Sequence, residues 1–447
     1  MGPELADAAT KPLAWNELVA ELRRYSIAER VTVEALNLAD ESASQRPTEP
    51  ALVVHRLTQD AARFKVCKPV TDSGAALGLL CDALPEDTKD PQHWPLFAHC
   101  LPHVFHIDLL SKTWNLPLAQ HTWLLDRTAS YLHHGPALFE RSRALGNHAL
   151  IVCQRALGED HPITLTFMNN LAGTLRSQND LVGSRQLLRQ VLKMSSRVLG
   201  REHPDTLRSM NNLAGTLRNQ GKLGRARKVQ EWVLAIRHKS LGAEHPDTLT
   251  SMSDLASTMA SQGDLIGARE LHEHVLELRR RVLGEEHLNT LTSMNNVAVA
   301  LVTQGDLASA GKLMEKVQRI RRRVQGVDHP DTLRTTSNLA FIVWRQGDLQ
   351  RARELEEHVL DAQRRVLGEG HPDTFTTMNN LAVTLRAMGQ HSAAKALMSG
   401  AFSSRTSVFG DLHPDTIRSK LALETWQGKA PPVAIWRKLF ARLNGRR

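Results

Sequence analysis

A histidine recurs every 42 residues through more than half of the chain, and this period constrains the fold more than any other feature of the sequence. A glycine stands three residues before each of these histidines, and a threonine stands three residues after it. Self-similarity at a fixed period of roughly 20 to 50 residues is typical of repeat architectures, in which each unit packs against its neighbours. The histidines are His161, His203, His245, His287, His329, His371 and His413.

One unit, from Arg201 to Ala243, has the pattern of two helices joined by a turn. His203-Pro204-Asp205-Thr206 predicts a helix start, because proline at the first helical position loses no needed N–H and an acidic side chain suits the positive end of the helix dipole. Apolar residues then recur at helical spacing up to Asn219-Gln220-Gly221, which is typical of a left-handed helix end. A second helix follows and ends at Leu241-Gly242.

Neither helix of such a unit can bury its apolar face alone, but stacked units can, which predicts an all-α solenoid. The low aromatic content of 4% also favours helices over a β-sandwich. A basic segment, Trp436 to Leu443, is expected to cap the open end of the solenoid or, alternatively, to contact acidic lipid. The predicted organisation is a disordered N-terminus over 1–11, a small mainly helical region over 12–118, a degenerate repeat over 119–160, six repeats over 161–412, a truncated repeat over 413–427 and a capping helix over 428–447.

The first helix of each unit resembles that of a tetratricopeptide repeat. The run Met210-Asn211-Asn212-Leu213-Ala214-Gly215-Thr216-Leu217-Arg218-Asn219-Gln220-Gly221 carries the resemblance, together with Leu223 and Ala226 at the spacing of that motif. The 42-residue unit, with Leu-Gly-x-x-His-Pro-Asp-Thr between repeats, resembles the kinesin light chain subtype over about 270 residues. This resemblance implies a right-handed solenoid whose first helices line a concave groove. The heptad repeats that precede the solenoid in kinesin light chains are not evident in this sequence.

The segment over 12–118 has a different pattern. It resembles the winged-helix and linker region of STAND-type (NB-ARC) signalling NTPases, in which that region leads into tetratricopeptide repeats. The chain has no Gly-x-x-x-x-Gly-Lys-[Ser/Thr] sequence, so the nucleotide-binding module of that family is missing. The linker resemblance lies in Leu79 to Leu101. The other expected elements are a helix from Trp15 to Ser26, a loop from Asn37 to Pro50, a strand from Ala51 to Val54 and a helix from Arg56 to Phe64.

The sequence offers no constellation of residues for catalysis or metal binding. Neither Gly-x-Ser-x-Gly nor His-Glu-x-x-His is present. The periodic histidines stand one to a repeat, on the order of 10 Å apart, whereas the nitrogen ligands of one zinc ion lie within about 2.1 Å of it. We therefore expect no enzymatic activity, no metal and no cofactor.

The charge and the cysteine content bear on the kind of partner and on the cellular compartment. The net charge of +9, from 56 Lys and Arg against 47 Asp and Glu, suits an acidic partner without by itself implying nucleic acid. No Cys-x-x-Cys occurs, which predicts reduced thiols in a cytoplasmic protein. Met1 to Lys11 lacks an apolar signal segment and no run of 18 apolar residues occurs, so no integral membrane contact is expected. The cysteines are Cys67, Cys81, Cys100 and Cys153.

A polar column just before the core leucine of each first helix is the candidate binding site. An asparagine amide both donates and accepts hydrogen bonds, so a ladder of such residues can clamp the backbone of an extended peptide. The alternative is that these side chains bridge adjacent first helices, as Asn169, Asn211, Asn295 and Asn379 are expected to do. The column consists of Asn170, Asn212, Asp254, Asn296, Asn338 and Asn380.

Arginines on the same predicted side favour an acidic ligand or a C-terminal carboxylate, because the guanidinium fork binds carboxylates bidentately. The alternative is a solvated charged face. Val302 and Trp344 replace arginine at one place in the repeat, which predicts a small apolar pocket between the fourth and fifth repeats, with Trp344 either as an anchor for a partner or as part of the core. The arginines are Arg176, Arg208, Arg218, Arg334, Arg345 and Arg386.

These observations favour a non-enzymatic scaffold that binds an extended, acidic peptide or protein in its concave groove. The alternative function is the sensor or regulatory half of a STAND-type NTPase that has lost its P-loop module. A nucleic-acid partner is not expected, since its support is the net charge and the basic tail, and it would show a steep salt dependence. Replacing Asn212, Asn296 and Asn338 with alanine is expected to abolish peptide binding without unfolding. The oligomeric state stays open.

Overall fold

The computed structural model describes residues 28–32, 50–54, 73–88, 90–110, 118–135, 138–411 and 413–426. They belong to two compact units, Met1–Tyr131 with Ile151–Ala156 and Leu132–Leu150 with Leu157–Arg447. Among the described residues, no helix has the length and apolar character needed to cross a bilayer. The N-terminus over 1–11, the helices predicted over 15–26 and 56–64, the loop predicted before Pro50 and the C-terminal segment over 428–447 lie outside the described residues.

The first unit contains an antiparallel pair of strands. β1 (Ala28–Thr32) pairs with β2 (Pro50–Val54) in a register that sets Ala28 opposite Val54 and Thr32 opposite Pro50. β2 confirms the strand predicted at Ala51 to Val54. Pro50, predicted as the end of a loop, is the first residue of this strand, where proline is tolerated because its missing N–H removes little from the ladder.

The described helices of the first unit pack around apolar side chains. Phe97 is 1% exposed, and its ring stacks on that of Tyr131 with the centroids 5.0 Å apart. Cys100 is buried, and burial raises the pKa of its thiol to about 11, so the thiol stays protonated at neutral pH. The three described cysteines are free thiols. These helices are α4 (Ser73–Ala83), the short 3-10 helix η3 (Pro91–His93), α5 (Trp94–Leu110) and most of α6 (Leu118–His134).

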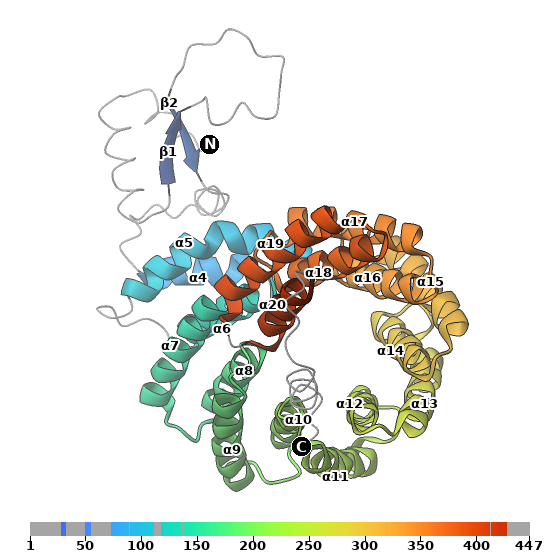
Figure 1. The fold of residues 1–447 in the computed structure, drawn as a ribbon. Helices are drawn as coiled ribbons and strands as arrows, with labels where there is room; N and C mark the ends of the chain where they lie inside the picture. Colours follow the sequence, from blue (N-terminus) through green and yellow to red (C-terminus); the bar gives the residue numbers. More distant parts are fainter. Residues whose placement is uncertain are drawn as a thin grey trace. The chain divides into compact units, whose positions relative to one another are not determined.

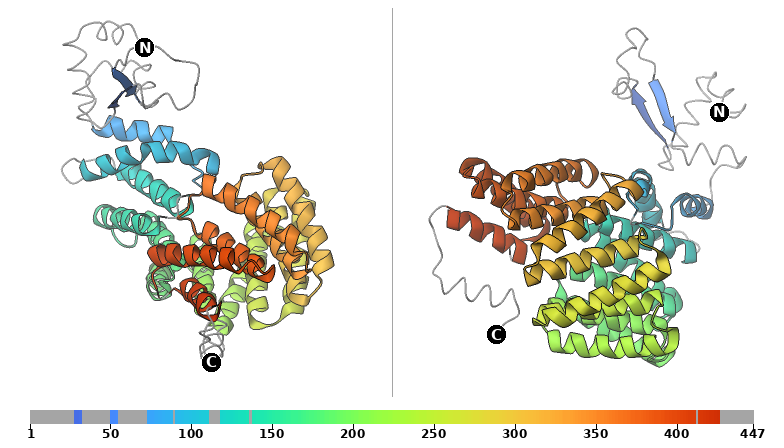
Figure 2. Two further views of the ribbon diagram at one scale, coloured as in Figure 1. Left: turned by 45° about the horizontal axis from the view of Figure 1, so that its top comes forward. Right: turned by 90° about the vertical axis from the view of Figure 1, so that its right-hand side faces the viewer.

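From residue 162 onward the chain is a series of helix pairs, each pair one repeat (Figures 1 and 2). Each helix packs against the next, and α8, α10 and α12 also contact one another in turn. The first helices of the repeats are α8 (Pro162–Ser177), α10 (Pro204–Asn219), α12 (Pro246–Gln262), α14 (Leu288–Gln304), α16 (Pro330–Arg345), α18 (Pro372–Ala387) and α20 (Pro414–Trp426). The second helices are α9 (Leu181–Val198), α11 (Leu223–Leu241), α13 (Leu265–Leu283), α15 (Leu307–Val324), α17 (Leu349–Val366) and α19 (His391–Phe409), and α7 (Phe139–Leu157) precedes them.

The helix pairs of these repeats form two layers. In Figure 1 the even-numbered helices α8 to α18 lie on the inner side of the curved stack and the odd-numbered helices α9 to α19 on its outer side. Apolar residues of both layers meet between them: Leu291, Met294 and Ala298 of α14 and Met314 of α15 are fully buried. The two-layer stack is the all-α solenoid that the repeat predicts.

The periodic histidine begins each first helix by capping it. The Nδ1 atom of His245 accepts a hydrogen bond from the backbone N–H of Asp247 at 3.2 Å, and the same contact recurs in every repeat from His161 to His413. The glycine and threonine columns complete the junction. Gly368 has φ 88°, and its carbonyl accepts a hydrogen bond from the buried hydroxyl of Thr374 at 2.9 Å. The histidine cap and the positive-φ glycine recur at each junction between repeats, whereas the threonine-to-glycine hydrogen bond forms at the junctions of Thr164 and Thr374.

A buried arginine near the end of several outer helices joins one repeat to the next. The NH1 atom of Arg279 donates to the hydroxyl of Ser293 at 2.8 Å and to the carbonyl of Asn289 at 3.2 Å. Arg237 and Arg405 make the same pair of contacts one repeat earlier and three repeats later. These side chains are 5 to 7% exposed, and the sequence pattern did not identify them.

Candidate functional site

Each inner helix leaves one side uncovered. On α14 the more exposed residues include Thr292, Asn296, Val299 and Thr303, which recur every three or four residues and therefore lie on one face of the helix. The rest of the helix packs against α13 and α15 and into the core. The uncovered side thus faces away from the outer layer. We call the corresponding surface of α8 to α18 the inner face.

The asparagine column lies on this inner face, and half of its members bridge adjacent inner helices. The amide of Asn212 donates to Asn169 at 3.1 Å, and that of Asn338 donates to Asn295 at 2.9 Å. Asp254 accepts from the amide of Asn211. These contacts are those of the alternative, bridging interpretation. An asparagine amide can make up to four hydrogen bonds, so bridging leaves capacity for a ligand.

The other members of the column differ in exposure. Asn170 is exposed, whereas Asn296 and Asn380 are half-buried. The backbone carbonyls of Asn170 and Asn380 accept from threonine hydroxyls one turn further along their own helices, as does that of Asn212. These bonds use the backbone carbonyls and do not involve the side chains of the column.

Some of the predicted arginines have acidic or aromatic partners of their own. Arg208 pairs with Asp205 at 3.0 Å and Arg334 with Asp331 at 2.6 Å, each within the first turn of its own helix. Arg386 lies over the ring of Trp426 at 5.0 Å. Their charges are partly compensated within the protein, which makes them weaker candidates for an acidic ligand than the sequence suggested.

Arg176 and Arg218 differ from these arginines. Both are half-buried, and neither forms an ion pair or a side-chain hydrogen bond with another described residue. Burial, and then the positive charge of Arg218, lower the pKa of Arg176, while Asp254 acts in the opposite direction. The structure therefore brings Arg176, Arg218 and Asp254 together on three successive inner helices, α8, α10 and α12. Asp254 is the one acidic side chain beyond the first turn in the inner helices α8, α10, α12, α14, α16 and α18.

The absence of a side chain at Gly215 leaves room for the guanidinium of Arg176. A Cβ atom added to Gly215 would lie 2.6 Å from the NH1 atom of Arg176, so the guanidinium of one helix rests on the bare backbone of the next. The sequence analysis did not identify this role. A signal was present, because Gly173 and Gly215 stand at the same place in their repeats, where later repeats carry Ser257 and Val299.

The inner face changes character beyond α12. Val299, Phe341 and Val383 occupy one place in three successive repeats and are 46%, 44% and 36% exposed. Arg345 lies over the ring of Phe341 at 5.9 Å, and the rings of Phe341 and Trp344 stack with their centroids 6.3 Å apart. This exposed apolar row was not predicted, although it can be read from the column that begins with Gly173.

Val302 and Trp344, which predicted an apolar pocket, belong to the core between α14 and α16. Val302 is 9% exposed, and Trp344 is partly buried against the same cluster. The indole N–H of Trp344 is buried with no hydrogen-bond partner among the described residues. Trp344 therefore packs against this cluster, and its ring also stacks on the exposed ring of Phe341.

The tetratricopeptide repeat family accounts for these helix pairs. Its repeat model matches residues 138–195, 168–239, 247–317, 296–365 and 338–407. Together these matches span more than half of the chain, so the chain belongs to the tetratricopeptide repeat family. This confirms the all-α solenoid expected from the sequence.

Solved structures include similar helical repeats. A kinesin light chain-like protein of Podosopora anserina with nearly identical TPR-like repeats is 32% identical over 46% of this chain and 98% of that chain, with a TM-score of 0.39. BtubC of P. vanneervenii is 20% identical over 53% of this chain and 92% of that chain, with a TM-score of 0.41. A Rap protein complexed with competence and sporulation factor is 11% identical over 83% of this chain and 99% of that chain, with a TM-score of 0.47. No curated protein matches the chain.

Proposed function

We propose that this protein is a non-enzymatic cytoplasmic scaffold that holds an extended acidic peptide on its inner face. Repeat solenoids present long concave surfaces that bind extended partners, and membership of the tetratricopeptide family supports a protein-interaction role. The observation that carries the acidic preference is the pair Arg176 and Arg218, which have no acidic partner of their own apart from the nearby Asp254.

The physical argument concerns desolvation. Burial of a guanidinium without a partner is unfavourable, and the depressed pKa of Arg176 reports that cost. A carboxylate placed between Arg176 and Arg218 would relieve the repulsion between them and accept charge-assisted hydrogen bonds, each contributing about 1.5 to 3 kcal/mol. A peptide with acidic side chains at this point is thus the ligand that the local charge favours.

The apolar row extends the same surface. Inner helices one repeat apart are separated by about 10 Å, so an extended chain of about 9 residues, at about 3.3 Å per residue, reaches from α10 to α16. A ligand that places carboxylates near Arg218 would then place its apolar side chains near Phe341. The half-buried asparagines between them supply donors and acceptors for its backbone.

Two variants test the proposal in opposite directions. The double variant Arg176→Ala and Arg218→Ala introduces the residue that stands at Ala260 in the next repeat. It is expected to weaken binding of a labelled glutamate-rich peptide by about 10- to 100-fold. Asp254→Asn introduces the residue found elsewhere in its column, keeps an acceptor for Asn211, and removes the opposing charge, so it is expected to strengthen binding several-fold.

Titration by fluorescence anisotropy, with thermal melts as the control for folding, measures both effects. Unchanged affinity in the arginine variant and in Asp254→Asn would reject the acidic preference. These variants are a sharper test than alanine at Asn212, Asn296 and Asn338, because Asn212 and Asn338 also bridge inner helices and their loss would disturb packing.

A second candidate is a regulatory half that acts with a separate STAND-type NTPase. The strand pair of β1 and β2 supports it, since β2 leads directly into His55-Arg56-Leu57, the segment on which the resemblance to the winged-helix region rests. A neighbouring reading frame that encodes a P-loop ATPase, or an upstream start that adds one, would support this function. Co-purification of that ATPase with the protein is the biochemical test.

A further inference from the structure

The positive charge of the protein is concentrated in one part of the chain. Residues 181–241, which form α9 to α11, contain 13 Lys and Arg against 3 Asp and Glu, a net charge of +10. The whole chain has a net charge of +9, so the remaining residues carry about one negative charge in excess. The modest average charge therefore conceals a strongly basic segment next to a nearly neutral remainder.

The repeats allow each basic residue to be compared with its counterparts. Arg227 pairs with Glu231 at 2.8 Å, Arg269 with Glu273 at 2.7 Å and Arg353 with Glu357 at 2.8 Å, each pair one helical turn apart. On α9 the same two places hold Arg185 and Arg189. A favourable pair in three repeats is thus a like-charge pair here, which destabilises a helix by a few tenths of a kcal/mol.

The sign of the charge is also reversed at Lys222, the residue that precedes α11. At this place Asp180, Asp264, Asp306 and Asp348 cap the second helix of their repeats through the side chain. Lys222 makes no such bond. Partial desolvation, and then the charges of Arg185, Arg225 and Arg189, lower the pKa of Lys222, which shows that these cations lie close enough to repel one another.

Most of the cations on the described helices α13, α15 and α17 have acidic partners, with Lys312, Arg319 and Arg322 of α15 among the exceptions. Arg351 pairs with Glu315 at 2.8 Å and Lys316 with Glu285 at 2.7 Å, and Arg281, Arg323 and Arg365 pair with acidic residues of the preceding repeat. Most of the cations of α9, of α11 and of the turn before α11 differ in this respect. Within the described residues, the side chains of Arg189, Lys193, Lys222, Arg225 and Lys228 form neither an ion pair nor a hydrogen bond.

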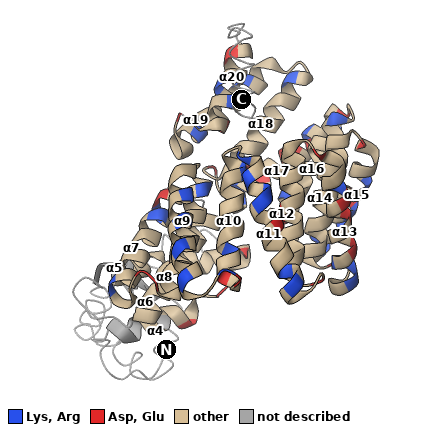
Figure 3. Cartoon of the chain, turned by 90° about the horizontal axis from the view of Figure 1, so that it is seen from below, with Lys and Arg blue, Asp and Glu red and all other residues tan. Residues whose placement is uncertain are grey.

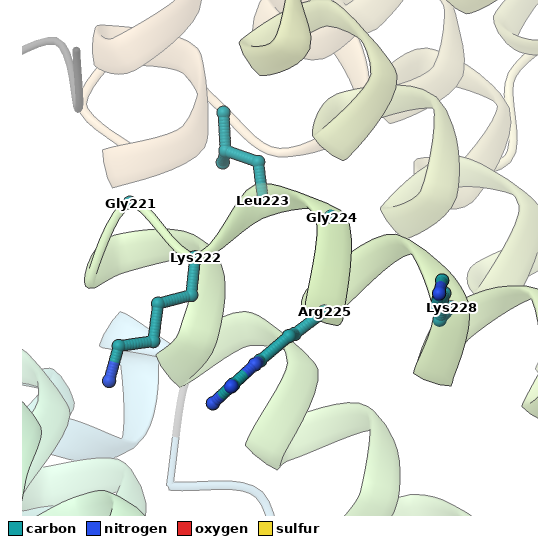
Figure 4. Close-up of a pocket in the computed structure, with 6 residues that line it drawn as sticks. All are labelled: Gly221, Lys222, Leu223, Gly224, Arg225 and Lys228. Carbon is teal, nitrogen blue, oxygen red and sulfur yellow. The ribbon is translucent and has the colours of Figure 1, made fainter. Parts of the chain in front are cut away.

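These side chains belong to α9, to α11 and to the turn before α11, in two neighbouring repeats. Figure 3 shows bands of Lys and Arg recurring along α9 and α11. Arg185, Arg189 and Lys193 follow one another at intervals of four residues, about 6 Å along the helix. Lys222, Arg225 and Lys228 line an open hollow of about 520 Å³ at the turn before α11 (Figure 4). Together these six residues form what we call the basic surface.

We propose that the basic surface binds the phosphate backbone of a nucleic acid. The cations are too many and too close together to stabilise the fold, and a polyphosphate neutralises such an array while it releases its own counterions. Arginine and lysine are the side chains that contact phosphates. The exposed carboxylate of Glu231, three residues after Lys228 on α11, is paired with Arg227.

A bilayer is a poorer fit to the same surface. Binding to lipid by an exposed helix requires an apolar face that enters the headgroup region. The main apolar faces of α9 and α11 are instead buried in the solenoid, where Leu188, Val191, Ala226 and Val233 are at most 1% exposed. The exposed apolar residues form no continuous face, because Val182 and Val198 lie on roughly opposite sides of α9, and Trp232 and Leu241 on opposite sides of α11. The basic surface is also separate from the inner face, so nucleic-acid binding does not depend on the peptide site.

The repeats supply the test variant. Arg189→Glu, Lys222→Asp and Lys228→Glu each introduce a residue that stands at the same place in another repeat, at Glu273, Asp264 and Glu270. The triple variant is therefore compatible with the fold and is expected to melt no lower than the wild type. The matched control is Lys312→Glu, Arg319→Glu and Arg322→Glu, three exposed cations of α15 with the same total change in charge.

Binding of a short labelled DNA duplex of mixed sequence to the full chain is measured over a range of salt concentrations. The wild type is expected to bind at low salt, with the logarithm of the affinity falling linearly with the logarithm of the salt concentration. The triple variant is expected to reduce the magnitude of that slope by about 3, because each phosphate contact contributes about 0.9. The α15 control is expected to keep the wild-type slope.

Other outcomes would overturn the proposal. One is no binding of the duplex by the wild type at low salt, and another is an equal loss in the triple variant and the α15 control, which would indicate net charge alone. Binding of polyglutamate or of phosphatidylserine vesicles that falls in the triple variant as much as duplex binding does, and not in the α15 control, would assign the surface to an acidic protein or to lipid. If the triple variant misfolds, Lys222→Asp alone restores the cap and is expected to change the slope by about 1, and an unchanged slope there rejects the proposal.

Discussion

The NH1 atom of Arg176 lies against the backbone of Gly215, so closely that a Cβ atom on Gly215 would stand 2.6 Å from it. Gly215→Ala is therefore expected to displace the guanidinium and weaken binding of a glutamate-rich peptide several-fold. Alanine in place of glycine within a helix should at the same time stabilise the fold by about 0.5 to 1 kcal/mol.

Gly173 is the matched control for this prediction. It stands at the same place one repeat earlier, and a Cβ atom there would meet nothing within 4 Å. Gly173→Ala is expected to raise the melting temperature similarly and leave peptide affinity unchanged. Equal affinity in the two variants, measured by the same anisotropy titration, would show that the position of Arg176 over Gly215 does not matter for binding.

His272 makes stability depend on pH. Burial, and then the charge of Arg279, lower the pKa of His272 from 6.5 to about 4. Between these values the unfolded chain binds a proton that the folded chain does not, so the free energy of unfolding falls as the pH falls from about 6.5 to about 4. Gln230 fills the same place in α11 and is 1% exposed, so His272→Gln fits the core.

Urea unfolding of the wild type and of His272→Gln, at about pH 7.5 and about pH 4.5, isolates this contribution. The wild type is expected to lose about 2 kcal/mol more than the variant on acidification. The other titratable groups are present in both proteins, so their contributions cancel in the comparison. Identical losses in the two proteins would contradict a depressed pKa at His272.

Glu356 makes stability depend on pH in the opposite direction. It occupies in α17 the position that His272 occupies in α13, and it is 4% exposed. Burial raises the pKa of Glu356 from 4.5 to about 7, and the hydroxyl of Thr384 acts in the opposite direction. The folded state keeps a proton that the unfolded state has lost, so this group's contribution to stability is complete below about pH 4.5 and is lost as the pH rises through about 7.

Glu356→Met introduces the residue found at Met314 and Met398 in the same column, both fully buried. It is expected to raise the free energy of unfolding by about 3 kcal/mol at about pH 8, and by much less at about pH 5. Guanidinium unfolding at the two pH values measures the difference. A gain that is the same at both would indicate better packing and not relief of a buried carboxylate.

Sequence periodicity predicted the helices well, because one junction repeats with the same residue types. His203 directly precedes the first residue of α10, and Gly221 lies two residues beyond its last residue and two before α11. The buried arginines were missed for a physical reason. In the sequence Arg279 and Arg280 are indistinguishable, and the difference between them is set by the serine and the carbonyl that the next repeat brings to Arg279.

The candidate site was predicted less completely. The position of the asparagine column follows from helical periodicity, but its hydrogen bonds depend on the spacing between neighbouring helices, as the bond from Asn212 to Asn169 shows. From the sequence, all six arginines were predicted to bind an acidic ligand. Arg208 and Arg334 have aspartates three residues earlier on their own helices, a signal that was present in the sequence, whereas the juxtaposition of Arg176 and Arg218 requires the stacked structure.

Arg279 should contribute far more to stability than its neighbour. Arg279→Ala removes two hydrogen bonds from a side chain that is 7% exposed and leaves the hydroxyl of Ser293 without that partner, which is expected to cost about 2 to 4 kcal/mol. Arg280 is 41% exposed and pairs with Glu285 at 3.4 Å. Arg280→Ala is expected to cost less than about 1 kcal/mol in the same urea unfolding experiment. Similar losses in the two variants would show that the hydrogen bonds from Arg279 to the next repeat do not stabilise the protein.

Leu288 is the exception in a column of prolines, and its replacement should stabilise the protein. Proline is the first residue of α8, α10, α12, α16 and α18, whereas α14 begins with Leu288, which is 42% exposed. The preceding residue, His287, already has the extended conformation (φ −65°, ψ 138°) that proline requires of its neighbour. Leu288→Pro is expected to raise the free energy of unfolding by about 0.4 to 1 kcal/mol, mainly by restricting the unfolded chain.

Leu307 provides the contrast for this substitution. It is the first residue of α15, but its backbone N–H donates to the carbonyl of Gly305 at 2.9 Å and its side chain packs against the core. Leu307→Pro would remove both contacts and is expected to destabilise the protein, although the two substitutions are chemically identical. Thermal and urea unfolding of the two variants would decide the matter: destabilisation by Leu288→Pro would mean that the N–H of Leu288 has a partner or that its side chain packs more tightly than its exposure indicates.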